Sequence, residues 1–101
     1  MIKIILADDH DLVRTGIRRI LEDESEFSVI AEAKNGEEAV QLCRKNAPDV
    51  VLMDVNMPEM NGIEALQQIK KHNPAIIVII LTAYSNVNDA VGAVKEGAYN
   101  Y

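Results

Sequence analysis

Four short segments of the chain are almost wholly apolar and rich in β-branched residues. They are Ile2 to Ala7, Phe27 to Ala33, Val50 to Met53, and Ile76 to Leu81. Apolar runs without alternation are typical of strands that are buried on both faces of a parallel sheet. The second run contains Ser28 and Glu32, so we expect it to form an edge strand.

Segments with the apolar spacing of amphipathic helices follow these strands. In the first, apolar residues recur at i, i+4, i+7 and i+8, with Arg14, Arg18, Arg19 and Glu22 predicted on other faces. The four apolar stripes are Val13/Ile17/Ile20/Leu21, Ala39/Leu42/Cys43, Ile63/Leu66/Ile69 and Val87/Ala90/Val91/Val94/Ala98. Asn35 and Asn61 each precede a glutamate by three residues, which predicts a capping box at the start of the second and third helices.

Strict alternation of strands and helices predicts an α/β fold. Short connections favour a parallel sheet with right-handed crossovers and helices on both faces, that is, a doubly wound sheet. Residues 99–101 would begin a fifth strand. The length of 101 residues fits one domain, with a core large enough for an ordinary globular fold.

The composition argues against several functional classes. The formal net charge is -6, and no basic stripe is present, so nucleic-acid binding by this chain is not expected. Cys43 is the single cysteine, which excludes an internal disulfide and favours a reducing cytoplasm. We expect Cys43 to be a small buried hydrophobe. No apolar run approaches the roughly 20 residues of a membrane span, and the start does not resemble a signal peptide.

Polar residues follow three of the predicted strands directly. Asp8 and Asp9 follow the first, Asp54 the third and Thr82 the fourth. In doubly wound sheets, sites form beyond the carboxyl ends of the strands. Three clustered carboxylates would repel one another unless one is protonated or a cation lies among them, and all-oxygen donors suit Mg²⁺. A carboxylate beside Mg²⁺ can attack phosphorus and form an acyl phosphate, which Thr82 could hydrogen-bond.

Each of these residues also has a simpler interpretation. Asp9 or Asp11 could be only a helix N-cap, and Thr82 only a β-forming residue. His10 is expected to be an ordinary surface side chain. No glycine-rich phosphate loop is present, so a nucleotide is not expected to bind here.

Together these segments resemble the receiver domains of two-component response regulators, the CheY-like superfamily. The resemblance covers the whole chain. It depends on Asp8-Asp9, the run from Met53 to Gly62, Leu81-Thr82-Ala83 and Glu96-Gly97-Ala98 in that order. The segments from Ala7 to Gly16 and from Asn35 to Ala39 are similar to the branch that usually carries a LuxR-type helix-turn-helix. The resemblance implies a flavodoxin-like (βα)5 fold with strand order 2-1-3-4-5.

The resemblance also implies a role for each site residue. Asp54 would accept a phosphoryl group from a sensor histidine kinase. Asp9 would ligate Mg²⁺ directly, Asp8 mainly through water, and Asn56 through its backbone carbonyl. Thr82 would bind the phosphoryl group and Tyr101 would be the switch aromatic. The chain would therefore be a cytoplasmic, phosphorylation-controlled signalling switch rather than an enzyme with turnover, and a DNA-binding output domain would follow in the full-length protein.

One departure concerns the end of the sequence. The family has a lysine three positions beyond the switch aromatic, and the sequence ends at Tyr101. Residues 1–101 would then be an incomplete receiver domain lacking most of the fifth strand and the fifth helix. The fourth strand would become an apolar edge, so self-association is expected.

Alternatives from other functional classes stay open at this point. One is a receiver-fold interaction module that is never phosphorylated, favoured only by the missing lysine. Another is an aspartyl phosphohydrolase, which Asn56 disfavours because these enzymes carry a second aspartate there. A flavin-binding protein is disfavoured because no tryptophan is available for stacking.

Overall fold

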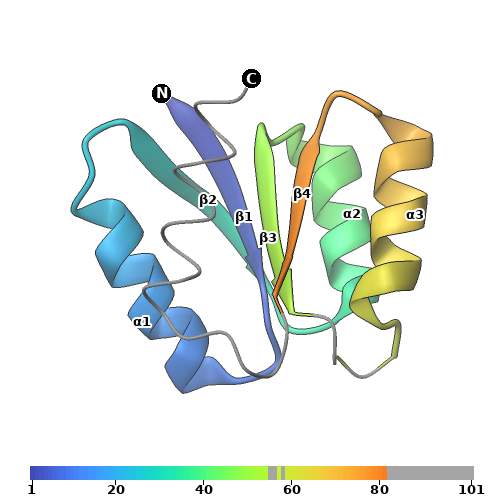
Figure 1. Cartoon of the computed structure of the whole chain (residues 1–101), viewed down its shortest axis with the longest axis horizontal. Coiled ribbons are helices and arrows are strands. Elements are labelled where there is room, and N and C mark those ends of the chain that lie inside the picture. The colour runs from blue at the N-terminus through green and yellow to red at the C-terminus, as the bar shows by residue number, and fades with distance from the viewer. Residues whose placement is uncertain (55–56, 58, 82–101) are drawn as a thin grey trace.

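Seven elements alternate along the chain in the computed structural model, which describes residues 1–54, 57 and 59–81 (Figure 1). In chain order they are β1 (Ile2–Ala7), α1 (Asp11–Glu22), β2 (Phe27–Ala33), α2 (Gly36–Asn46), β3 (Val50–Asp54), α3 (Gly62–His72) and β4 (Ile77–Leu81). All four predicted strands and the first three helices are therefore confirmed. The predicted helix over residues 87–98 and the start of a fifth strand lie outside the described residues.

The four strands form one parallel sheet in the order β2-β1-β3-β4. This order confirms the doubly wound topology, and β2 is an edge strand as predicted. Helix α1 lies on one face of the sheet, whereas α2 and α3 lie side by side on the other (Figure 1). The topology therefore directs the carboxyl ends of β1 and β3, which are neighbours, to the same edge of the sheet.

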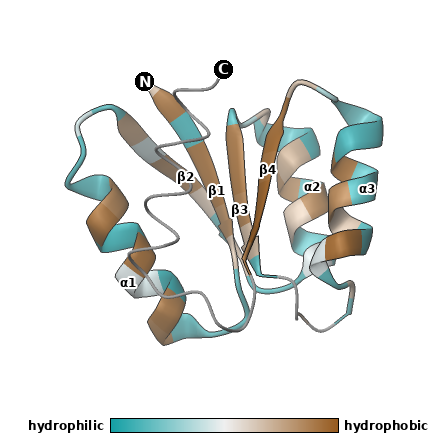
Figure 2. Ribbon diagram, in the orientation of Figure 1, coloured by the Kyte–Doolittle hydropathy of each residue, from teal (hydrophilic) through white to brown (hydrophobic). Residues whose placement is uncertain are grey.

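Two hydrophobic cores fill the space between the layers. Alternate residues of β1 and β3 face opposite ways, as the period of a strand requires. Ile4 and Leu6 pack with Ile17 and Leu21 of α1. The second core lies under α2 and α3 and includes Ile5, Ala7, Val51, Met53, Ala39, Cys43, Ala65 and Ile69. Figure 2 shows the resulting pattern, with the central strands more hydrophobic than the helices that cover them.

The predicted helix starts are confirmed at α2 and α3. The side chain of Asn35 accepts a hydrogen bond from the Glu38 backbone N–H at 2.8 Å, and Asn61 accepts one from Glu64 at 2.9 Å. The reciprocal half of the capping box at α2 is displaced by one residue, because Glu38 accepts from the Lys34 N–H. A polar side chain thus satisfies one of the free N–H groups at the start of each of these two helices.

The predicted face of α1 is partly wrong. Ile17 and Leu21 are buried, but Val13 and Ile20 are 41% and 37% exposed, and Arg14 is buried instead. Arg14 turns inward because its guanidinium finds three acceptors near the carboxyl end of the sheet, which are Glu32, the Asp8 carbonyl and Asp11. The strand bounds also differ slightly, since β3 extends to Asp54 and β4 begins at Ile77.

Among the described residues, no helix has the length and apolar character to cross a membrane.

Candidate functional site

The sheet register places the aspartates of two strands at the same level. Ala7 of β1 lies opposite Met53 of β3, so Asp8 and Asp54 come next on adjacent strands. Asp8, Asp9 and His10 form the turn from β1 into α1, and Asp54 is the last residue of β3. The predicted meeting of Asp8, Asp9 and Asp54 is therefore observed.

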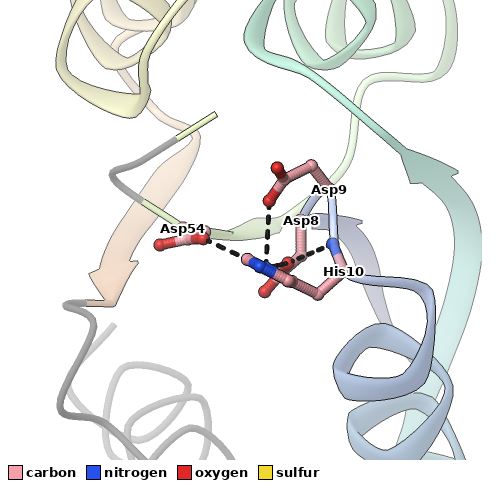
Figure 3. Close-up of side chains that lie close together, drawn as sticks. All are labelled: Asp8, Asp9, His10 and Asp54. Atoms are coloured by element: carbon pink, nitrogen blue, oxygen red, sulfur yellow. Dashed lines mark hydrogen bonds and ion pairs between the residues drawn. The ribbon is translucent and has the colours of Figure 1, made fainter. Parts of the chain in front are cut away.

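Four side chains converge at this edge of the sheet (Figure 3). One potential ligand atom from each of Asp8, Asp9, His10 and Asp54 lies within 4.8 Å of all the others. The His10 Nδ1 atom is 3.1 Å from an Asp8 oxygen, 3.0 Å from an Asp9 oxygen and 4.0 Å from an Asp54 oxygen. The side chains of Asp8 and Asp54 are only 11% and 13% exposed, whereas His10 is 65% exposed. The cluster is thus a partly buried acidic pocket that is open on the His10 side.

Hydrogen bonds fix both the backbone N–H and the side-chain carboxylate of Asp8. Its backbone N–H donates to the Ala33 carbonyl of β2 at 3.0 Å. Its carboxylate accepts from the His10 backbone N–H at 2.7 Å, closing a turn between the strand and α1. The carboxylate therefore has a defined direction before any ligand arrives.

The negative charge of the pocket changes the pKa of His10. The hydrogen bond to Asp8, followed by the negative charges of Asp9 and Asp8, raises the pKa of the His10 imidazole above its usual value. His10 was predicted to be an ordinary surface side chain. It is exposed, but its Nδ1 atom contacts the carboxylates, and an imidazolium there offsets part of their repulsion.

The N-cap interpretation of the aspartates does not hold. His10, not Asp9 or Asp11, occupies the N-cap of α1, and its side chain makes no capping hydrogen bond. Asp11 is the first helical residue and pairs with Arg14. The Asp9 carboxylate is left to face the pocket.

The donor set fits a hard divalent cation. Three carboxylates, two from the turn after β1 and one from the end of β3, offer oxygen atoms, and the partial exposure of Asp9 and His10 leaves room for water ligands. Oxygen donors with retained waters are the environment that Mg²⁺ prefers. A cation would also relieve the repulsion among carboxylates at this spacing. The cluster could therefore hold a metal ion.

A second network, which the sequence interpretation missed, adjoins the pocket. The guanidinium of Arg14 donates to Asp11, to Glu32 of β2 and to the backbone carbonyl of Asp8. Arg18 bonds the other oxygen of Glu32 and also bonds Glu22. The available signals were a glutamate in a largely apolar strand and the Asp11–Arg14 spacing of three. Neither shows that the arginine reaches the Asp8 carbonyl.

Three predicted site residues lie outside the described part of the chain. These are Asn56, Thr82 and Tyr101. Leu81, which pairs with Asp54 across the sheet, directly precedes Thr82 in the sequence.

Comparison with known proteins gives a consistent result. Residues 4–101 match the family model described as the response regulator receiver domain. The chain is 46% identical to the response regulator UvrY of Escherichia coli (strain K12) over 101 residues, which are all of this chain and 46% of UvrY. The chain thus spans less than half the length of the curated relatives it matches first.

Solved structures show the same similarity. The signal receiver domain of NarL from Mycobacterium tuberculosis superposes with a TM-score of 0.89 at 25% identity, covering 99% of this chain and 98% of that one. A two-component response regulator of the LuxR family from Aurantimonas sp. SI85-9A1 gives a TM-score of 0.77 at 36% identity, covering 97% and 66% of the two chains.

Proposed function

The chain belongs to the response regulator receiver domain family, and we propose that Asp54 accepts a phosphoryl group as the switch of a two-component signalling system. The observation that carries this proposal is the position of Asp54. The strand β3 delivers a single carboxylate, 13% exposed, into a pocket that already contains two others from the end of β1. Such a pocket suits the binding of a metal and a phosphoryl group together.

We propose that Asp8, Asp9 and Asp54 hold Mg²⁺, with the backbone carbonyl of Asn56 as a further ligand. Bound there, the ion would neutralise charge on the phosphoryl oxygens as they are transferred. The contributions of the chain are to aim the carboxylates and to keep them partly shielded from water. The hydrogen bonds that fix Asp8 support this role.

The proposed step is a transfer between two nucleophiles. A carboxylate oxygen of Asp54 forms a bond to phosphorus, and the bond from phosphorus to the donor breaks. In a histidine kinase the leaving group is the imidazole nitrogen, which retains the bonding electron pair and takes up a proton. The product is an acyl phosphate on Asp54. The chain acts as the acceptor in this scheme and not as an enzyme with turnover.

Several finer assignments complete the proposal. Thr82 would bind the transferred phosphoryl group, and Tyr101 would be the switch aromatic. Residues 1–101 would form one receiver domain. In the whole protein we propose a sensor histidine kinase as partner, a C-terminal DNA-binding output domain and a cytoplasmic location. The similarity to UvrY and to a LuxR-family regulator supports the output domain.

Beryllofluoride, which mimics a phosphoryl group, provides a test that needs no kinase. Fluorine NMR of the wild-type chain with Mg²⁺, beryllium and fluoride is expected to show a protein-bound signal that disappears on addition of a chelator. Asp54→Asn should lack the signal, and Asp23→Asn, at the exposed end of α1, should retain it. A bound signal of equal size in Asp54→Asn would refute the assignment of the acceptor.

A further inference from the structure

We propose that Arg14 is a positioning residue of the metal site, which holds the peptide between Asp8 and Asp9 in the orientation that metal binding requires. The inference rests on the proposed function, because it concerns how the same pocket is built. It adds a residue outside the acidic cluster, from a face of α1 other than the predicted apolar stripe.

Arg14 contacts the backbone of Asp8 directly. The Nη1 atom of Arg14 donates to the Asp8 backbone carbonyl at 2.6 Å. That carbonyl belongs to the peptide that leads into Asp9. Its direction therefore sets where the Asp9 residue starts and which way its carboxylate can point.

The guanidinium of Arg14 is itself fixed. Its Nε atom donates to Glu32 at 2.9 Å, and its Nη2 atom donates to Asp11 at 2.6 Å. Arg14 is 8% exposed, so the side chain has little freedom to turn away. A planar guanidinium held at three nitrogens donates its hydrogen bonds in fixed directions, whereas the ammonium group of a lysine does not.

The other restraints on Asp8 come from residues other than Arg14. The Asp8 N–H is bound to Ala33, and the carboxylate to the His10 N–H. Arg14 supplies the restraint on the carbonyl. Ala33 and Glu32 are consecutive residues at the end of β2, so the edge strand supports the Asp8 turn by a direct bond and through Arg14.

Arg18 offers a matched control. It bonds the same glutamate, Glu32, and also Glu22, but its side chain is 44% exposed and no bond joins it to Asp8 within the described residues. Replacing Arg18 by lysine perturbs the same α1–β2 ion-pair network without touching the carbonyl. A difference between the two positions therefore reports the Asp8 contact and not the network.

The test is the Mg²⁺ dissociation constant of the full chain, measured by calorimetry at a temperature where every variant is folded in chelator. Arg14→Lys keeps the charge but loses the three-point geometry. Replacement of groups that orient metal ligands typically weakens metal binding by about 10- to 100-fold, and we expect a loss of about 10-fold. Arg18→Lys should bind Mg²⁺ as the wild type does. A purely structural role for Arg14 would lower the melting temperature and leave the dissociation constant unchanged.

A second variant keeps the test decisive if Arg14→Lys does not fold. Glu32→Ala leaves the arginine in place but removes the acceptor of its Nε atom, and it should weaken Mg²⁺ binding in the same direction. Wild-type affinity in a folded Arg14→Lys, or in Glu32→Ala where Arg14→Lys does not fold, would overturn the inference. If the wild-type chain binds no Mg²⁺, the proposed metal site is wrong as well as the inference about Arg14. If the wild-type chain binds Mg²⁺ and the variant binds it equally well, only the inference about Arg14 is wrong.

Discussion

The proposed chemistry depends on individual carboxylates, and these repel one another in the absence of a cation. Asp8 and Asp54 are held by the strands, whereas Asp9 projects from the turn and is 33% exposed. His10 contacts both Asp8 and Asp9 from the solvent side. His10 therefore offsets only part of the negative charge, and the carboxylates have the capacity to bind a further cation.

This capacity predicts a specific effect of Asp9→Ala. Mg²⁺ should raise the melting temperature of the wild-type chain, since a ligand that binds only the folded state stabilises it by about 2.7 kcal/mol at 100 times its dissociation constant. Asp9→Ala should lose most of this increase. In chelator the variant should be at least as stable as the wild type, because a repulsive charge is gone and the exposed contact with His10 contributes little.

Thermal melts with and without Mg²⁺ would measure both effects, and Asp23→Ala is the control for loss of a surface carboxylate. Equal stabilisation of Asp9→Ala and the wild type by Mg²⁺ would contradict the role of Asp9.

Cys43 provides a test of burial at the residue scale. It is 1% exposed in the core under α2, and burial raises the pKa of its thiol from 9.0 to about 11. The protonated form is thus favoured in the folded state. A difference of two pKa units corresponds to about 100-fold less thiolate near pH 7 than in the unfolded chain. We expect alkylation by iodoacetamide to be at least that much slower in the native protein than in denaturant. Similar rates in both states would show that α2 does not seal the core.

At the scale of elements, the sequence pattern predicts strands better than helix faces. The four strand runs and the two asparagine caps are all observed, because each depends on local backbone preferences. The buried face of α1 was predicted in part. Its orientation depends on Arg14 reaching a carbonyl on another element, which periodicity cannot indicate.

A close approach between α2 and the loop before α3 predicts the effect of Gly36→Ala. The Gly36 N–H donates to the Met60 carbonyl at 3.0 Å, and a β-carbon on Gly36 would lie 2.1 Å from that oxygen. The clashing atom is backbone, so the loop that follows Asp54 would have to move. We expect a loss of about 1–3 kcal/mol in the free energy of unfolding.

Denaturant unfolding would measure this loss, with Glu37→Ala, the next and exposed residue, as the control. Exposed substitutions of that kind usually change stability by less than about 0.5 kcal/mol. A Gly36→Ala variant as stable as the control would mean that the loop does not approach α2 so closely.

At the scale of the whole molecule, the sheet order explains why the site was predictable. With β1 and β3 adjacent and parallel, residues 8 and 54 meet although 46 positions separate them in the sequence. Topology alone brings the acidic residues together, so their meeting follows from the strand pattern. The contacts of His10 and Arg14 depend on side-chain direction, which a sequence pattern does not contain. Thr82, Tyr101 and the fifth strand remain predictions.

The measurement that tests the central claim most directly is the intact mass of the chain after incubation with acetyl phosphate and Mg²⁺. The proposed function predicts a gain of one phosphoryl group in the wild type and in the surface control Asp23→Asn. It predicts no gain in Asp54→Asn, and none in the wild type when a chelator replaces Mg²⁺. An undiminished gain in Asp54→Asn would contradict the account, because the acceptor would then lie elsewhere in the chain.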